Sequence, residues 1–154
     1  MSIKIIPYEP VHAYTILEKN VRERDLWLSA FPDWDKVATV WKEDGPADTI
    51  MFENNPVCSY GIILMSWDRG ELWSLLSSLF YTHWRECFKI FKRRLSETIK
   101  DFKLVRVQTL VFPDYPDAAR LVEHLGFKEE GLLRKYGPNH EDLFMYARLA
   151  DETH

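Results

Sequence analysis

Residues 71–111 read ELWSLLSSLFYTHWRECFKIFKRRLSETIKDFKLVRVQTLV, and the spacing of their apolar side chains changes twice. Glu71 to Phe80 has the composition of a strand, and Lys103 to Val111 alternates between apolar and polar residues as a strand does. Thr82 to Lys100 between them has a helical period with one apolar stripe: Trp84, Phe88, Phe91, Leu95 and Ile99. A strand, a helix and a strand in this order predict two parallel neighbouring strands joined by a right-handed crossover.

The residues before this stretch contribute further strands and two helices. We expect strands at Ile3–Ile6, Thr49–Glu53 and Val57–Trp67, because short apolar runs there are bounded by Pro, Asn and Gly turn signals. Val11–Leu28 has a helical period, and Asp33 is placed to cap a second helix that runs to about Lys42.

The residues after it predict one helix and a final hairpin. Asp114 is a plausible N-cap for a helix through Leu125, which Gly126 would end. Glu130–Tyr136 and Asp142–Leu149 are expected to be strands. The resulting order predicts an α/β fold, a mixed sheet with helices on both faces, formed by residues 1–154 as a single domain.

Composition excludes several classes of protein. The chain has 154 residues, a net charge of −4 and two cysteines, so neither a disulfide scaffold nor generic nucleic-acid binding is indicated. We expect no metal site, because the five histidines are scattered. No apolar run reaches the length of a membrane helix, and residues 1–10 do not resemble a signal peptide, so we expect a soluble, cytoplasmic protein.

Two groups of residues resemble the GNAT superfamily of N-acetyltransferases. Ala118–Phe127 (AARLVEHLGF) is similar to the superfamily helix that ends in Gly-Phe, and Lys128–Arg148 to its last hairpin. Gly70–Ser77 (GELWSLLS) and Glu130–Pro138 (EGLLRKYGP) resemble phage-encoded GNAT-like proteins, related to the internal virion protein A family of short-tailed phages. The resemblance covers about residues 48 to 149. It implies a central mixed sheet of about six to seven strands, whose parallel pair diverges near Ser77 and Val111.

The resemblance implies a site for acetyl-CoA as co-substrate. In the superfamily, the backbone of the strand before the long helix pairs with the pantetheine arm, and a glycine-rich loop wraps the pyrophosphate. Helix N-termini favour anions, and glycine allows close backbone approach. The matching residues here are Leu75, Leu76, Ser77, His83, Trp84 and Arg85, and residues 77–86 contain no glycine.

The resemblance also implies catalytic positions. Glu71 is the candidate general base, and the alternative is a solvated turn carboxylate next to Arg69. The usual Asn and the usual general-acid Tyr of the superfamily correspond to Tyr115 and Val122. Because valine carries no proton to donate, Tyr136 is the candidate acid, with packing in the sheet as the alternative.

Arg134 and Tyr146 are the candidate acceptor-binding residues. The competing interpretation pairs Arg134 with Asp142 across the hairpin and buries Tyr146 in the sheet. Residues 81–106 carry eight Lys and Arg against three Asp and Glu, which suits CoA phosphates, nucleic acid or an ordinary solvated helix face.

Three hypotheses remain open. The first is a phage-encoded, acyl-CoA-dependent N-acetyltransferase that acts by direct attack of an amine, for example on a small molecule or a modified DNA base. The second is a catalytically degenerate GNAT-like protein that binds a phage or host protein in virion assembly or host takeover, in the host cytoplasm or the virion. The third is a nucleic-acid-binding module built on the basic helix.

Overall fold

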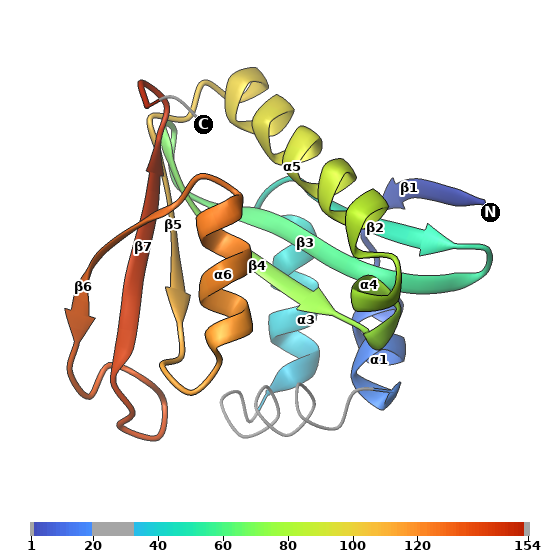
Figure 1. The fold of residues 1–154 in the computed structure, drawn as a ribbon, viewed down its shortest axis with the longest axis horizontal. Coiled ribbons are helices and arrows are strands. Elements are labelled where there is room, and N and C mark those ends of the chain that lie inside the picture. Colours follow the sequence, from blue (N-terminus) through green and yellow to red (C-terminus); the bar gives the residue numbers. More distant parts are fainter. Residues whose placement is uncertain (1, 20–32, 153–154) are drawn as a thin grey trace. The chain divides into compact units, whose positions relative to one another are not determined.

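The computed structural model describes residues 2–19 and 33–152, which form a seven-stranded sheet and five helices (Figure 1). The strands are β1 (Ile3–Pro7), β2 (Ala47–Phe52), β3 (Asn55–Ser66), β4 (Arg69–Leu76), β5 (Arg106–Val111), β6 (Lys128–Leu133) and β7 (Leu143–Leu149). The helices are α1 (Pro10–Lys19), α3 (Trp34–Glu43), α4 (Ser78–Thr82), α5 (Trp84–Asp101) and α6 (Pro116–His124). None of these described helices is long and apolar enough to cross a bilayer.

The strand order is β1-β2-β3-β4-β5-β7-β6, with β4 and β5 parallel. This confirms the mixed sheet and the parallel pair that the sequence predicts. The β4–β5 register runs from Arg69↔Arg106 to Glu71↔Gln108. Just beyond it, the Thr109 hydroxyl donates a hydrogen bond to the carbonyl oxygen of Leu72 at 3.0 Å. The divergence of the two strands further on, and the hand of the crossover, stay predictions.

The described chain divides into two compact units. Unit 1 is Met1–Ile63 with Trp73–Arg94, and unit 2 is Leu64–Leu72 with Leu95–His154. Strands β3 and β4 and helix α5 each contribute residues to both units.

One face of unit 1 is an aromatic cluster between helices α1 and α3 and strand β4. Trp41 stacks on Trp73 with ring centroids 4.1 Å apart and planes 8° apart, and Tyr8 meets the edge of Trp73 at 5.0 Å. The Tyr8 hydroxyl donates to the carbonyl oxygen of Ala38 at 3.0 Å, which satisfies the buried phenolic group. The remaining members are Ala13, Ile16, Leu17, Trp34 and Leu75.

The opposite face of unit 1 packs against helix α5. Phe91 of α5 stacks on Tyr60 of β3 at 4.3 Å, and Arg94 donates to Asp48 of β2 at 3.0 Å. Alternate strand residues point to opposite faces, so Ser59 lies on the other side of β3 from Tyr60. There its hydroxyl is hydrogen-bonded to Thr49, which in turn is hydrogen-bonded to His12 of α1, each at 2.8 Å. Helices therefore cover both faces of this unit, as expected.

Unit 2 is organised by β7, which pairs with β5 on one side and β6 on the other. Arg148 of β7 is only 7% exposed, and its guanidinium donates to the carbonyl oxygen of Leu125 and to the hydroxyl of Ser96, each at 3.0 Å. Gly126 has φ 95° and ends α6, which confirms the predicted stop.

The end of β4 differs from the sequence prediction. The strand was expected to reach Phe80, but it stops at Leu76, and residues 78–82 form the short helix α4. Both the backbone N–H and the hydroxyl of Ser77 donate to the carbonyl oxygen of Val57, at 2.9 and 2.8 Å. These bonds tie the strand end to β3, and Phe80 then becomes buried as part of a helix, at 3% exposure.

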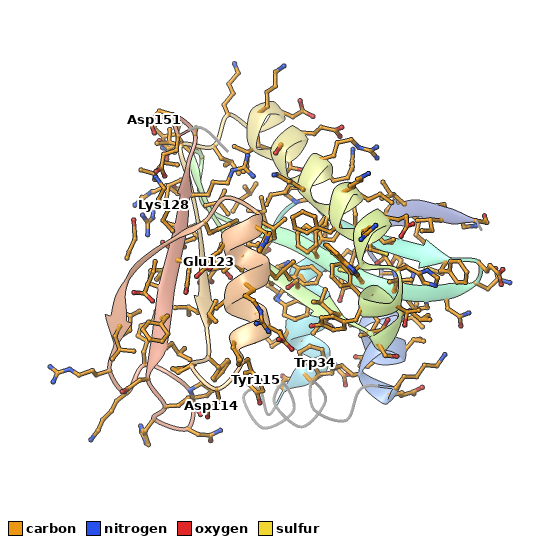
Figure 2. All side chains as sticks on the ribbon, in the orientation of Figure 1. Trp34, Asp114, Tyr115, Glu123, Lys128 and Asp151 are labelled. Carbon is orange, nitrogen blue, oxygen red and sulfur yellow. The ribbon has the colours of Figure 1, made fainter. Side chains whose placement is uncertain are left out.

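Of the two predicted helix caps, one is wrong and the other holds its position without a side-chain hydrogen bond. The N-cap of α6 is Tyr115 rather than Asp114, because Pro116 takes the first helical position, where its fixed φ and missing N–H are favourable (Figure 2). Asp33 does occupy the N-cap position of α3, but its side chain makes no capping hydrogen bond. The first predicted helix is described from Pro10 to Lys19, and its remainder to Leu28 lies outside the described residues.

Two predicted strands have different limits. β5 begins at Arg106 rather than Lys103, and β6 runs from Lys128 to Leu133 rather than to Tyr136. Lys103 and Lys135 have φ values of 51° and 53°, which place both in left-handed turn conformations. These turns bound the two strands.

Candidate functional site

Glu71 lies within β4 as a half-buried strand residue, so the interpretation as a solvated turn carboxylate is wrong. It stands in register with Gln108 of β5, and its carboxylate accepts a hydrogen bond from the Gln108 side chain. Burial raises the pKa of Glu71 above its ordinary value, and the Gln108 hydrogen bond partly opposes that shift. A carboxylate with a raised pKa is a stronger base than an ordinary one, which suits it to accept a proton.

Gln108 belongs to a longer network of side chains on the same face. The Nε of Arg106 donates to Oε1 of Gln108 at 3.2 Å. The other two guanidinium nitrogens of Arg106 donate to both carboxylate oxygens of Glu130, at 3.0 and 2.7 Å. This bidentate pair raises the pKa of Arg106 and lowers that of Glu130, so both groups stay charged.

Glu130 reaches Arg106 because β6 is irregular there. The β6–β7 register passes from Glu129↔Tyr146 to Gly131↔Met145 and leaves Glu130 without a partner residue on β7. An extra strand residue of this kind redirects its side chain. Ala147 of β7, which stands opposite Gln108, has only a methyl side chain.

Tyr146 lies on the opposite face of the sheet from Glu71. It pairs with Thr109, the strand neighbour of Gln108, and its hydroxyl donates to Glu123 of α6 at 3.3 Å. Burial raises the pKa of Tyr146, which is 3% exposed. The structure therefore does not bring this predicted acceptor-binding residue together with Glu71.

Arg134 and Tyr136 follow the end of β6 and are exposed, Tyr136 at 59%. Asp142 accepts a hydrogen bond from the backbone N–H of Lys135 at 2.9 Å, in place of the expected pair with Arg134. The exposed position keeps both predicted residues accessible to a ligand.

The predicted donor-binding residues lie in unit 1. Leu75, Leu76 and Ser77 are 0%, 6% and 4% exposed, so their side chains belong to the core. The hydroxyl of Ser77 is already engaged by Val57.

His83, Trp84 and Arg85 lie where α4 meets α5. The His83 ring stacks on Phe52 at 4.7 Å, and the Arg85 guanidinium lies 5.8 Å from the centroid of the Trp84 ring. Trp84 is 53% exposed. A cation beside an exposed aromatic ring at the start of an 18-residue helix is a favourable environment for an anionic, aromatic ligand.

Helix α4 lies within residues 77–86, where the resemblance predicts the loop around the pyrophosphate. The N–H groups of Phe80 and His83 donate to the carbonyl oxygens of Ser77 and Leu79, at 3.1 and 3.0 Å. These donors are therefore committed within the helical turn.

Sequence reasoning missed Arg106, Gln108 and Glu130 as members of the site. Strand alternation already places Arg106 and Gln108 on one face, and this was an available signal. Glu130 gave none, because its orientation depends on the irregular register of β6. Among residues 2–19 and 33–152, no group of three or more His, Cys, Asp or Glu side chains is placed to hold a metal ion.

No protein-family model and no curated protein sequence matches the chain. Solved structures do match its fold. A GNAT-family acetyltransferase from Bacillus anthracis superposes with a TM-score of 0.74 and 16% identity, over 99% of this chain and 97% of that one. A ribosomal-protein alanine acetyltransferase from Vibrio fischeri has a TM-score of 0.71 and 16% identity, over 99% and 95%.

A variant of spermidine N-acetyltransferase from Vibrio cholerae gives a TM-score of 0.70 and 14% identity, over 97% of this chain and 95% of that one. The chain therefore has the fold of the GNAT N-acetyltransferases.

Proposed function

We propose that the chain is an acyl-CoA-dependent N-acetyltransferase that acts by direct transfer. The observation that carries the proposal is the half-buried carboxylate of Glu71, raised in pKa and held by Gln108 on a parallel strand pair in a GNAT fold. The amine nitrogen attacks the thioester carbonyl carbon, the C–N bond forms and the C–S bond breaks. Glu71 takes the proton that the amine loses, directly or through water.

The donor would be bound by residues 75–85. The backbone of Leu75 and Leu76 would contact the pantetheine arm and polarise the thioester carbonyl, whereas the N–H of Ser77 already donates to Val57. The nucleotide end would be held by His83, Trp84 and Arg85. Their side chains would take the place of backbone N–H groups that are already hydrogen-bonded within α4. Trp84 and Arg85 are exposed, which supports this role.

The leaving thiolate needs a proton, and Tyr136 is the proposed source. Of the two tyrosines of the last hairpin, Tyr136 is exposed, whereas Tyr146 is buried with its hydroxyl bonded to Glu123. Arg134, next to Tyr136 and exposed, is the proposed contact for the acceptor. The acceptor class is a primary amine, carried by a small molecule, a protein or a modified DNA base.

One observation favours a second candidate function. Because α4 lies where the resemblance predicts a glycine-rich loop, a GNAT-fold protein without catalysis is the alternative. It would act by binding a phage or host protein in virion assembly or host takeover.

A thermal shift with acetyl-CoA separates the two functions. A ligand that binds only the native state at about 100-fold excess over its Kd adds about 2.7 kcal/mol of stability, which raises the melting temperature by several degrees. Arg85→Ala should reduce this shift, and Lys92→Ala, seven residues further along α5, serves as the matched control. No shift at millimolar acetyl-CoA would favour the protein-binding function.

Turnover tests the base itself. Glu71→Gln should lower turnover about 10² to 10⁴-fold while the acetyl-CoA thermal shift stays intact, because only proton transfer is lost. Normal turnover in this variant would remove Glu71 from the mechanism.

A further inference from the structure

The amide of Gln108 has only one orientation that suits its neighbours. Its Oε1 accepts the N–H of Arg106, and a guanidinium can only donate. The NH₂ end therefore faces Glu71 and donates to the carboxylate. A reversed amide would place its NH₂ against the guanidinium and its oxygen against the carboxylate, so both contacts would become repulsive.

The far end of the network keeps Arg106 in place. Glu130 binds the guanidinium through two nearly parallel hydrogen bonds, a geometry that fixes its plane as well as its position. Each side chain therefore orients the next one. Glu130 of β6 orients Arg106 of β5, Arg106 orients Gln108, and Gln108 orients Glu71 of β4.

We propose that Gln108 is a positioning residue that orients the Glu71 carboxylate and is itself oriented by the Arg106–Glu130 pair. The inference rests on the proposed function, in which Glu71 is the base. With one carboxylate oxygen held by Gln108, the other is directed towards the proton that it accepts. Proton transfer depends on such alignment, and small misplacements slow it strongly.

Of the charged groups near Glu71, those of this network act on its carboxylate most directly. On its own strand, Arg69 donates to Ser66 at 3.2 Å and lies 3.8 Å from Asp68. β3 carries no titratable side chain between residues 61 and 66, and Arg148 of β7 lies on the other face of the sheet. Among the described residues of β5, β6 and β7, the other charged groups on the face of Glu71 are Arg106, Glu130 and Lys128, and Lys128 is separated from Glu71 by β5 and β7.

The test replaces Gln108 with methionine, which has similar length but donates no strong hydrogen bond. Removing a donor to the ionised carboxylate should raise the pKa of Glu71, so the acid limb of the kcat/KM profile should move to higher pH. We expect kcat to fall about 10- to 100-fold and KM for acetyl-CoA to stay within about twofold. Glu130→Gln should move both quantities in the same direction by less, and Leu110→Met on the same face of β5 should move neither.

An NMR titration makes the test independent of turnover. The side-chain carboxyl carbon of Glu71, labelled with ¹³C and assigned by its absence in Glu71→Gln, reports its pKa directly. An unchanged pKa in both Gln108→Met and Glu130→Gln, with a lower melting temperature, would mean that the network only supports the fold and would overturn the inference.

The two proposals fail differently. If Glu71→Gln keeps full turnover, Glu71 is not the base. The positioning role of Gln108 is then refuted as well, even where the titration shows that Gln108 sets the ionisation of Glu71. If Gln108→Met does not fold, Glu130→Gln carries the same titration and the same pH profile.

Discussion

Gly61 should not tolerate a side chain, because β2 and β3 approach closely there. A Cβ at this position would lie 2.7 Å from Cβ of Ala47, 2.8 Å from the carbonyl oxygen of Pro46 and 2.9 Å from Cε2 of Trp73. Non-bonded carbon atoms normally lie about 3.5 to 4.0 Å apart, so the contacts to Ala47 and Trp73 would have to widen by about 1 Å. The Pro46 oxygen is held by the N–H of Ile62 at 3.0 Å, and Trp73 is held by its stacked neighbour.

Gly61→Ala should therefore lower the free energy of unfolding by about 2 to 3 kcal/mol, the usual cost of inserting a methyl group into a packed interior. For a chain of this size, the melting temperature should fall by about 4 to 12 °C. Urea denaturation followed by circular dichroism measures the change, and the slope with urea should stay constant if only the native state is affected.

Gly131→Ala is the matched control, because it adds the same methyl group to another strand. No atom lies within 4 Å of the Cβ that it would add, and neither glycine has a positive φ. We expect its stability to stay within about 0.5 kcal/mol of the parent. Equal urea midpoints for the two variants would refute the reasoning from close strand approach.

Three further predictions concern buried polar groups. Burial lowers the pKa of His12, so as pH falls the unfolded chain takes up a proton at this residue before the native chain does. The free energy of unfolding should therefore decrease below about pH 6.5, and the decrease should be smaller in His12→Asn. Urea titrations at several pH values measure both. Arg148→Leu should cost about 2 to 3 kcal/mol in chemical denaturation, because it removes a charged donor from the buried carbonyl oxygen of Leu125. Ser77→Ala should cost only about 1 kcal/mol in the same assay, since its backbone N–H still binds the oxygen of Val57; a larger loss for Ser77→Ala than for Arg148→Leu would contradict the relative weight given to the two contacts.

The fold could be predicted where the spacing of apolar residues along the chain defines both the elements and their connection. The parallel pairing of β4 and β5 follows from the strand, helix and strand pattern of residues 71–111. The end of β4 does not, because the apolar run continues through Phe80 and only the tertiary contact between Ser77 and Val57 stops the strand. Pro116 is a local signal for the start of α6, because proline favours the first helical position, and it places the N-cap at Tyr115.

The candidate site shows the same division. Alternation along β5 is sufficient to place Arg106 and Gln108 on one face, and Glu71 was accessible through the resemblance. The face of Tyr146 depends on its register with Thr109, which the sequence does not specify. Registers between strands distant in the chain arise from tertiary packing, so side chains that depend on them could not be assigned in advance.

The stacked indoles of Trp41 and Trp73 also give the protein an optical property. The two rings are 4% and 6% exposed, so their emission should lie at shorter wavelengths than that of indole in water. Trp67 is 88% exposed and should already emit at the long wavelengths typical of indole in water. Short-wavelength emission would then follow the aromatic cluster of unit 1 without any attached dye, and its loss would record the separation of α3 from β4.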